Sequence, residues 1–240
     1  LVWIVFFLMA KNAPGQRKVK GWSDYAAVLK MGDTGWFCFL YSLTFGGFVG
    51  LSSYLSIFFH DQYQLSKVQS GDYTTFVILF GSFLRPVGGA LADRIGGYRL
   101  LVGLLAGVGL CMGGVATLPS AGLALAFLAI GMGLLGMGNG SVFQLVPQRF
   151  PNSVGVLTGI VGAAGGLGGF FLPSLLGMLK DRTGSFGIGF AVLAILACGG
   201  VFTLVLLRRP WSKTWPEDAA VRAGLLTKSE ELAGSYAARI

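Results

Sequence analysis

The chain has 240 residues, of which 54% are hydrophobic and only 12% are charged. A soluble domain carries roughly a quarter charged residues, so this composition excludes an ordinary soluble fold and indicates a protein of the lipid bilayer. The 18 Lys and Arg residues outnumber the 10 Asp and Glu residues, which gives a formal net charge of +8. Such an excess is typical either of nucleic-acid binding or of membrane topology, and the placement of the charges decides between them.

In chain order, two segments precede the main hydrophobic stretches. Residues 1–10 are hydrophobic but only about half as long as a membrane span. They lack the basic start and the small-residue cleavage site of a signal peptide, so we interpret them as the end of a truncated transmembrane helix. Residues 11–35 are largely polar and basic, and we interpret them as a central cytoplasmic loop.

Six long apolar stretches follow, and charged residues are rare within them. A helix needs about 20 apolar residues to cross a bilayer, and each stretch is long enough. In lipid the backbone must satisfy its own hydrogen bonds, which leaves helices or closed barrels, and these stretches lack the alternation of barrel strands. We therefore predict an all-α membrane protein. The predicted helices cover residues 36–59, 69–92, 100–118, 122–146, 154–179 and 186–207.

Residues 208–240 complete the chain, and we predict that they form an exposed cytoplasmic tail. Lys and Arg are divided unequally between the two sides that the predicted helices define, with fourteen on one side and three on the other. The positive-inside rule places the basic side in the cytoplasm, together with the central loop and the tail. The net charge therefore reflects the topology of a multi-pass protein in a plasma or inner membrane, and no nucleic-acid partner is predicted.

One arginine lies inside a predicted span. Arg85 follows Asp72 by thirteen residues and precedes Asp93 by eight, which places it about 20 Å and about 12 Å from them along a helix. A cation at that depth costs about 3 kcal/mol to insert and normally faces the interior of a bundle. No span carries a plausible buried carboxylate, so we interpret Arg85 as a site for an anion, because a guanidinium offers two parallel N–H donors to a planar oxyanion. The alternative is a carboxylate partner outside this chain.

Weaker candidates lie on two other spans. Tyr41 and Phe45 are one helical turn apart on the first span, whereas Gly138 and Ser141 share a face of the fourth, with Asn139 next to Gly138. A Tyr–Phe pair at this spacing is usually a packing contact. Beside a buried arginine, however, aromatic faces and hydroxyl groups can enclose a flat anion.

Glycine is the second strong signal, with 39 residues in the chain. On the fifth span Thr158, Gly162, Gly166 and Gly169 lie roughly on one helical face, and Gly165 adjoins it. Small residues at this spacing let helices approach closely in lipid. We interpret the stripe first as a packing surface and second as a surface that slides during transport.

Enzymatic motifs receive no support. Residues 131–136 match G-x-G-x-x-G, but they lie inside an apolar span with no preceding strand. The sequence contains neither a nucleophile–base pair nor a cluster with metal-ligand spacing. We predict that the protein is not an enzyme and uses no cofactor or metal.

Residues 89–99, Gly-Ala-Leu-Ala-Asp-Arg-Ile-Gly-Gly-Tyr-Arg, resemble the cytoplasmic signature loop of the major facilitator superfamily. The long basic segment before six closely spaced spans is similar to the central loop of a twelve-helix transporter. The resemblance implies the second six-helix bundle of such a transporter, with an amino-terminal six-helix half as its partner. We interpret Gly89, Asp93, Arg94 and Arg99 as a conformational latch, or alternatively as a tight loop that only sets topology.

Three further segments, residues 81–89, 136–144 and 158–170, resemble the nitrate/nitrite porter family, and the last is similar to its glycine-rich signature. That family implies a central anion site with one arginine from each half, enclosed by aromatic residues. On this resemblance Arg85 is the second-half arginine. The other substrate contacts that it implies are Tyr41, Phe45, Gly138 and Ser141, with Asn139, Thr158, Gly162, Gly165 and Gly166 as secondary candidates.

These observations lead to one function and several alternatives. We predict secondary active transport of nitrate or nitrite by alternating access, either as nitrate/proton symport or as nitrate/nitrite antiport. The absence of a buried carboxylate in the sequence favours exchange. The alternatives are a major facilitator carrier for another small solute, an anion channel, and a membrane scaffold or sensor that transports nothing.

Overall fold

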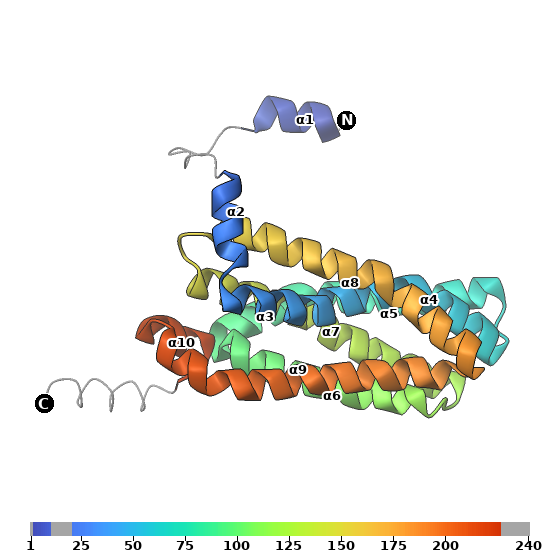
Figure 1. The fold of residues 1–240 in the computed structure, drawn as a ribbon. Helices are drawn as coiled ribbons and strands as arrows, with labels where there is room; N and C mark the ends of the chain where they lie inside the picture. Colours follow the sequence, from blue (N-terminus) through green and yellow to red (C-terminus); the bar gives the residue numbers. More distant parts are fainter. Residues whose placement is uncertain (1, 11–20, 227–240) are drawn as a thin grey trace, which may run out of the picture.

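A computed structural model describes residues 2–10 and 21–226, and all of the regular structure in these two ranges is helical. Figure 1 shows long helices that run side by side, with α8 along one face of the bundle and α6 and α9 along the opposite face. The elements are α1 (Val2–Met9), α2 (Trp22–Leu29), α3 (Gly32–Tyr41), the π-helical turn η1 (Ser42–Gly46), α4 (Gly47–Tyr63), α5 (Lys67–Ile95), α6 (Gly97–Ala116), α7 (Ala121–Arg149), α8 (Val154–Thr183), α9 (Phe186–Thr214) and α10 (Glu217–Ala223).

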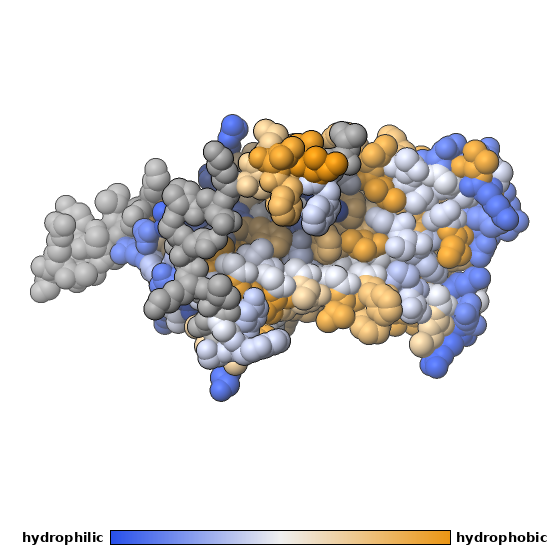
Figure 2. Space-filling view, turned by 90° about the horizontal axis from the view of Figure 1, so that it is seen from above, coloured by the Kyte–Doolittle hydropathy of each residue, from blue (hydrophilic) through white to orange (hydrophobic). Residues whose placement is uncertain are grey.

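Six of the described helices are long and apolar enough to cross a membrane, counting α3, η1 and α4 as one continuous helix. Most of them exceed the roughly 20 residues that a bilayer requires, so their ends extend past the apolar region. Hydrophilic side chains gather at the two ends of the bundle, with apolar side chains between them (Figure 2). The prediction of an all-α membrane bundle with six spans is confirmed.

Close backbone contacts between α5 and α7 organise the centre of the bundle. A methyl group added at Gly136 of α7 would overlap the carbonyl oxygen of Gly81 on α5, and one added at Gly88 of α5 would overlap the backbone of Met137. Helices in lipid associate through such packing because the surrounding acyl chains are as apolar as the helix surfaces, so there is no hydrophobic driving force for association. α7 also packs along α6, which in turn packs against α9.

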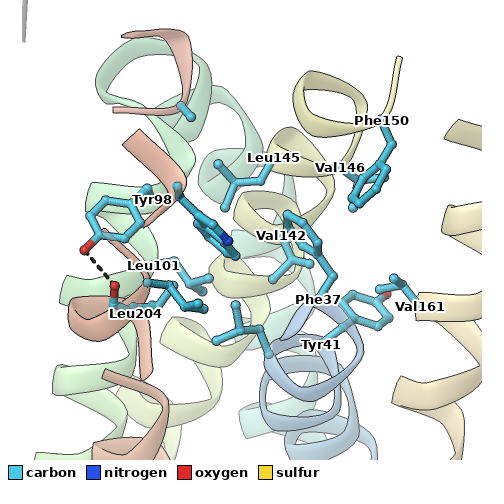
Figure 3. Close-up of a cluster of buried hydrophobic side chains, with 14 of the residues drawn as sticks. Phe37, Tyr41, Tyr98, Leu101, Val142, Leu145, Val146, Phe150, Val161 and Leu204 are labelled. Atoms are coloured by element: carbon cyan, nitrogen blue, oxygen red, sulfur yellow. Dashed lines mark hydrogen bonds between the residues drawn. The ribbon is translucent and has the colours of Figure 1, made fainter. Parts of the chain in front are cut away.

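Buried side chains fill the space between the helices near the α10 end of the bundle. Figure 3 shows Phe37 and Tyr41 of α3 in this cluster, with Tyr41 close to Val161 of α8. On the other side of the cluster the hydroxyl of Tyr98 donates a hydrogen bond of 3.0 Å to the carbonyl oxygen of Leu204, which ties α6 to α9.

The expected loop and tail differ from the structure where it describes them. Residues 22–29 of the expected central loop form α2, and α3 begins at Gly32; residues 11–20 lie outside the described residues. The prediction of an exposed tail from residue 208 onward is wrong for its first part. α9 continues to Thr214, α10 folds back onto the bundle, and Trp211 is only 1% exposed.

The tail packs because its apolar residues share faces. Trp211 and Trp215 lie one turn apart with ring centroids 5.2 Å from each other, and Ala219, Ala220 and Ala223 give α10 a small apolar face. The basic side chains that suggested exposure, such as Arg209, do remain on the surface. Residues 227–240, the remainder of the expected tail, lie outside the described residues.

The folded tail contacts the loop between α5 and α6. Gly96 in that loop has φ = +90° and Gly224 after α10 has φ = +79°. A methyl group added at Gly96 would lie 2.5 Å from the Cα of Gly224. The side chain of Gln144 bridges the two segments, because its Oε1 accepts from the Gly97 N–H at 3.1 Å and its Nε2 donates to the Arg222 carbonyl at 3.4 Å.

This contact predicts that Gly96→Ala lowers stability. Alanine at a φ of +90° is strained by about 1–3 kcal/mol, and its methyl group also collides with Gly224. Thermal unfolding of the purified protein in detergent should show a lower midpoint. Gly103→Ala on α6 is the matched control, because a methyl group there meets nothing within 4 Å. Equal midpoints for the two variants would contradict the contact.

Candidate functional site

Arg85 lies in the second half of α5, half-buried, with its guanidinium against aromatic rings. Its Cζ is 4.3 Å from the ring centroid of Phe48 and 5.8 Å from that of Phe45. Its Nε is buried and has no hydrogen-bond partner, and no carboxylate of the described residues forms an ion pair with this arginine. Cation–π contacts stabilise such a charge but do not neutralise it, so the site retains a positive charge.

Tyr41 and Phe45 form one wall beside the arginine. Their rings stack with centroids 5.1 Å apart and an interplanar angle of 3°. Phe143 of α7 packs its ring against Tyr41 at 4.7 Å in an edge-on arrangement. Phe45 of the predicted aromatic pair therefore lies beside Arg85, and Tyr41 stacks on Phe45. Tyr41 is the last residue of α3, and Phe45 lies within the π-helical turn η1.

Asn139 of α7 is 6% exposed, and neither its Nδ2 nor its Oδ1 has a hydrogen-bond partner in the described structure. It lies three residues after Gly136, where an added methyl group would be 3.5 Å from the Cγ of Arg85. It also precedes Phe143 by four residues, and residues three and four apart share a helix face. Asn139 is therefore on the side of α7 that faces Arg85 of α5 and the aromatic wall. A buried amide without partners costs free energy, so a polar partner for Asn139 would be stabilising.

Gly138 and Ser141 lie on another side of α7. A methyl group added at Gly138 would be 2.8 Å from the Cγ2 of Thr44 and 3.7 Å from Leu101, so this glycine makes room for neighbouring helices. The hydroxyl of Ser141 donates to the Met137 carbonyl of its own helix at 3.2 Å. The structure does not bring these two predicted contacts to Arg85.

The glycine-rich face of α8 divides into two parts. A methyl group added at Gly165 would lie 2.5 Å from Cδ1 of Tyr41 and 3.1 Å from Cδ1 of Phe45, so this glycine seats the aromatic pair. Methyl groups at Gly162 and Gly166 would meet nothing within 4 Å. Thr158 donates its hydroxyl to the Val154 carbonyl of its own helix at 2.7 Å. Of the secondary candidates on α8, only Gly165 is shown against the aromatic pair.

The residues of the expected latch are spread along the end of α5 and the start of α6. The backbone of Gly89 lies against α7, because a methyl group at Gly140 would be 2.6 Å from its nitrogen. Asp93 and Arg94 are exposed and form no ion pair within the described ranges. Arg99 donates to the Leu226 carbonyl at 3.4 Å, so it contacts the folded tail.

Sequence reasoning missed three contributors to the site. Phe48 follows Phe45 by three residues, a spacing that was available as a signal. Phe143 follows Asn139 by four residues, and this spacing was also available as a signal. The π-helical turn carries no signal of its own in the chain, and it contains Phe45, whose ring centroid lies 5.8 Å from the Cζ of Arg85.

A second polar cluster ties three helices together near the α10 end. The Nε of Arg149 donates to Oδ2 of Asp33 at 2.5 Å, and the indole Nε1 of Trp211 donates to Oδ1 of the same carboxylate at 2.9 Å. Nη1 of Arg149 also donates to the Thr214 carbonyl at 2.9 Å. No group of three His, Cys, Asp or Glu side chains in the described part of the chain could hold a metal ion.

Comparison with known proteins identifies the family. The family model of the Major Facilitator Superfamily matches residues 1–173. The chain belongs to the major facilitator superfamily. The match runs from α1 into α8 and includes the signature loop, so the resemblance of residues 89–99 to that superfamily is confirmed.

Several curated proteins that are similar to this chain have names that refer to nitrate or nitrite. The chain is 39% identical over 173 residues to the "Nitrite extrusion protein" of Bacillus subtilis, an alignment that covers 71% of this chain and 43% of that protein. It is 38% identical over 182 residues to the "Probable nitrate/nitrite transporter NarK2" of Mycobacterium tuberculosis, covering 73% and 45%. It is 32% identical over 209 residues to the "Probable nitrate transporter NarT" of Staphylococcus epidermidis, covering 86% and 53%.

These alignments confirm the second resemblance as well, since this member of the superfamily falls in its nitrate/nitrite porter family. The chain spans about half the length of the curated relatives it matches.

The Asp33 cluster predicts a loss of stability on Asp33→Asn. The side chain is 18% exposed and accepts from two donors, so the neutral amide should cost about 1–2 kcal/mol of stability, after allowance for its partial exposure. Thermal unfolding in detergent measures the effect. Asp218→Asn is the control, because its ion pair with Arg222 is largely exposed and should contribute little. A midpoint for Asp33→Asn that equals that of Asp218→Asn would contradict the prediction.

Proposed function

We propose that this chain forms one half of a carrier that moves nitrate or nitrite across a membrane by alternating access. The observation that carries the proposal is Arg85, a half-buried cation against two phenylalanine rings without an acidic partner in the described ranges. A planar guanidinium suits a planar oxyanion because it presents two parallel N–H donors. The names of the curated relatives support the same class of substrate.

The anion site that we propose contains Arg85, the stacked rings of Tyr41 and Phe45, the ring of Phe48, and the amide of Asn139. The guanidinium supplies charge, and Nδ2 of Asn139 supplies a neutral donor that is unpaired in the described structure. The aromatic rings limit the site to flat ligands and keep water away, which strengthens the charge–charge interaction. In this proposal Ser141 and Gly138 pack helices and do not contact the substrate.

Alternating access requires a second bundle, which we propose is an amino-terminal six-helix half. Carriers of this kind bind the substrate near the middle of the membrane, between two halves that rock against each other. An anion bound at Arg85 would lower the cost of closing the cavity around the charge. The loop residues Gly89, Asp93, Arg94 and Arg99 would form the latch at the cytoplasmic end, where the folded tail also lies.

For coupling we favour nitrate/nitrite exchange over proton symport. The acidic residues of the six described spans, such as Asp61 and Asp72, lie near helix ends, so none is placed to carry a proton past Arg85. Exchange needs only that two planar anions compete for one site. Alkalinisation of the outside medium that accompanies nitrate uptake into proteoliposomes would instead indicate symport.

Replacing Arg85 tests the proposed function directly. Arg85→Lys keeps the charge but loses the paired donors, so the KM for nitrate should rise about ten-fold or more in the full-length transporter. Uptake of nitrate into proteoliposomes measures it, with nitrite, chlorate and organic anions as competitors. Arg209→Lys, at an exposed position, is the control. A normal KM in Arg85→Lys, or stronger competition by organic anions than by nitrite, would falsify the assignment.

The orientation of Asn139 gives a second test on one helix. Asn139→Ala removes the unpaired amide and should raise the KM for nitrate about three- to ten-fold, as expected for one hydrogen bond to an anion. Ser141→Ala should leave the KM unchanged, because the hydroxyl is already bonded to its own helix. The opposite ranking of the two variants would show that the substrate contacts the Ser141 side of α7.

A further inference from the structure

A π-helical turn interrupts the helix that carries the aromatic pair. η1 covers Ser42–Gly46, with α3 before it and α4 after it. Tyr41 immediately precedes this turn and Phe45 lies within it, and their rings stack within 3° of parallel. Turns of this kind are rare and occur often at functional sites.

A hydrogen bond between helices holds one end of this turn. The hydroxyl of Ser42 donates to the carbonyl oxygen of Ala164 on α8 at 2.9 Å, across 122 residues of sequence. A helical serine more commonly bonds to a carbonyl one turn back in its own helix, as Ser52 does with Phe48 at 2.7 Å. Ser42 therefore connects η1 to α8 immediately before Gly165, the glycine that seats the aromatic rings.

The backbone of α8 supports the same turn. A methyl group added at Gly46 would lie 3.0 Å from the nitrogen of Gly169 and 3.1 Å from the carbonyl oxygen of Gly165. One added at Gly168 would lie 3.2 Å from the Cβ of Ser42. Close contact of this kind sets the separation of the two helices, and the bond from Ser42 adds a directional contact between them.

Thr44, inside the turn, shows that the π form has a cost. Its hydroxyl is buried and has no hydrogen-bond partner in the described structure. Threonines in the regular helices donate to the carbonyl four residues earlier, as Thr74 does to Ser70 at 2.7 Å. Rewinding η1 as an α-helix would offer Thr44 the same bond, so contacts outside the turn must maintain the π form.

We propose that Ser42 is a positioning residue for the substrate: its bond to α8 maintains the π turn and thereby the alignment of Tyr41 and Phe45. This inference rests on the proposed function, because it names what sets the geometry of that anion site. Without the bond the turn rewinds, Phe45 leaves its place beside Arg85, and the aromatic wall opens. Substrate affinity falls, while the helices of the bundle remain assembled.

The first experiment measures the KM and maximal rate of nitrate uptake by the full-length transporter in proteoliposomes. Ser42→Ala should raise the KM about five-fold, the effect of losing one interhelical hydrogen bond, with little change in maximal rate. Ser52→Ala, the same change on the same helix, should leave both unchanged. In a Phe45→Leu background Ser42→Ala should add nothing, because its effect passes through that ring. A normal KM in Ser42→Ala, or an equal five-fold rise in the Phe45→Leu background, overturns the inference.

The second experiment needs no substrate. Hydrogen–deuterium exchange of peptides covering residues 41–47 should rise in Ser42→Ala and not in Ser52→Ala. If the wild-type protein does not bind nitrate but this exchange rises, the proposed function fails and the role of Ser42 in holding the turn stands. If the wild-type protein binds nitrate and Ser42→Ala matches Ser52→Ala in both measurements, the function stands and the inference fails. Gly168→Ala, which crowds Ser42, should raise the KM as well and replaces Ser42→Ala if that variant does not fold.

Discussion

The arrangement of the bundle centre depends on how one permanent charge is accommodated. Arg85 lies far from both ends of α5, and its guanidinium rests on the rings of Phe48 and Phe45 instead of on a carboxylate. Aromatic faces lower the cost of burying the cation but leave its charge uncompensated. A helix pair that brought an acidic side chain to this point would cancel the charge, and with it any attraction for an anion.

Close packing by glycine makes this placement possible. α5 and α7 touch backbone to backbone at Gly81 and Gly136, which brings the face of α7 that carries Asn139 next to the arginine. The same device acts between α8 and the π turn, where Gly165 leaves space for two rings. Larger side chains at these points would separate the helices and admit lipid or water. The glycines contribute to the site because they have no side chain.

The sequence was sufficient for the features that depend on composition and on local spacing. Charge-free stretches predicted the six spans, and the position of Arg85 well inside its helix followed from its distance to Asp72 and Asp93. It was harder to predict which side chains face one another, because the rule that residues three and four apart share a helix face assumes an unbroken α-helix. The π turn interrupts the helix that carries Tyr41 and Phe45, and the buried Trp211 reaches Asp33 across 178 residues, a contact that no local pattern contains.

α7 joins the two regions of the protein that carry polar contacts. Phe143 packs against Tyr41 of the aromatic wall, whereas Gln144, one residue later, bonds to both the loop after α5 and the folded tail. Arg149 at the end of the same helix binds Asp33 at the start of α3, the element that leads to the aromatic pair. The same helix therefore contributes residues both to the site and to the polar contacts at the α10 end, with Pro147 between Gln144 and Arg149.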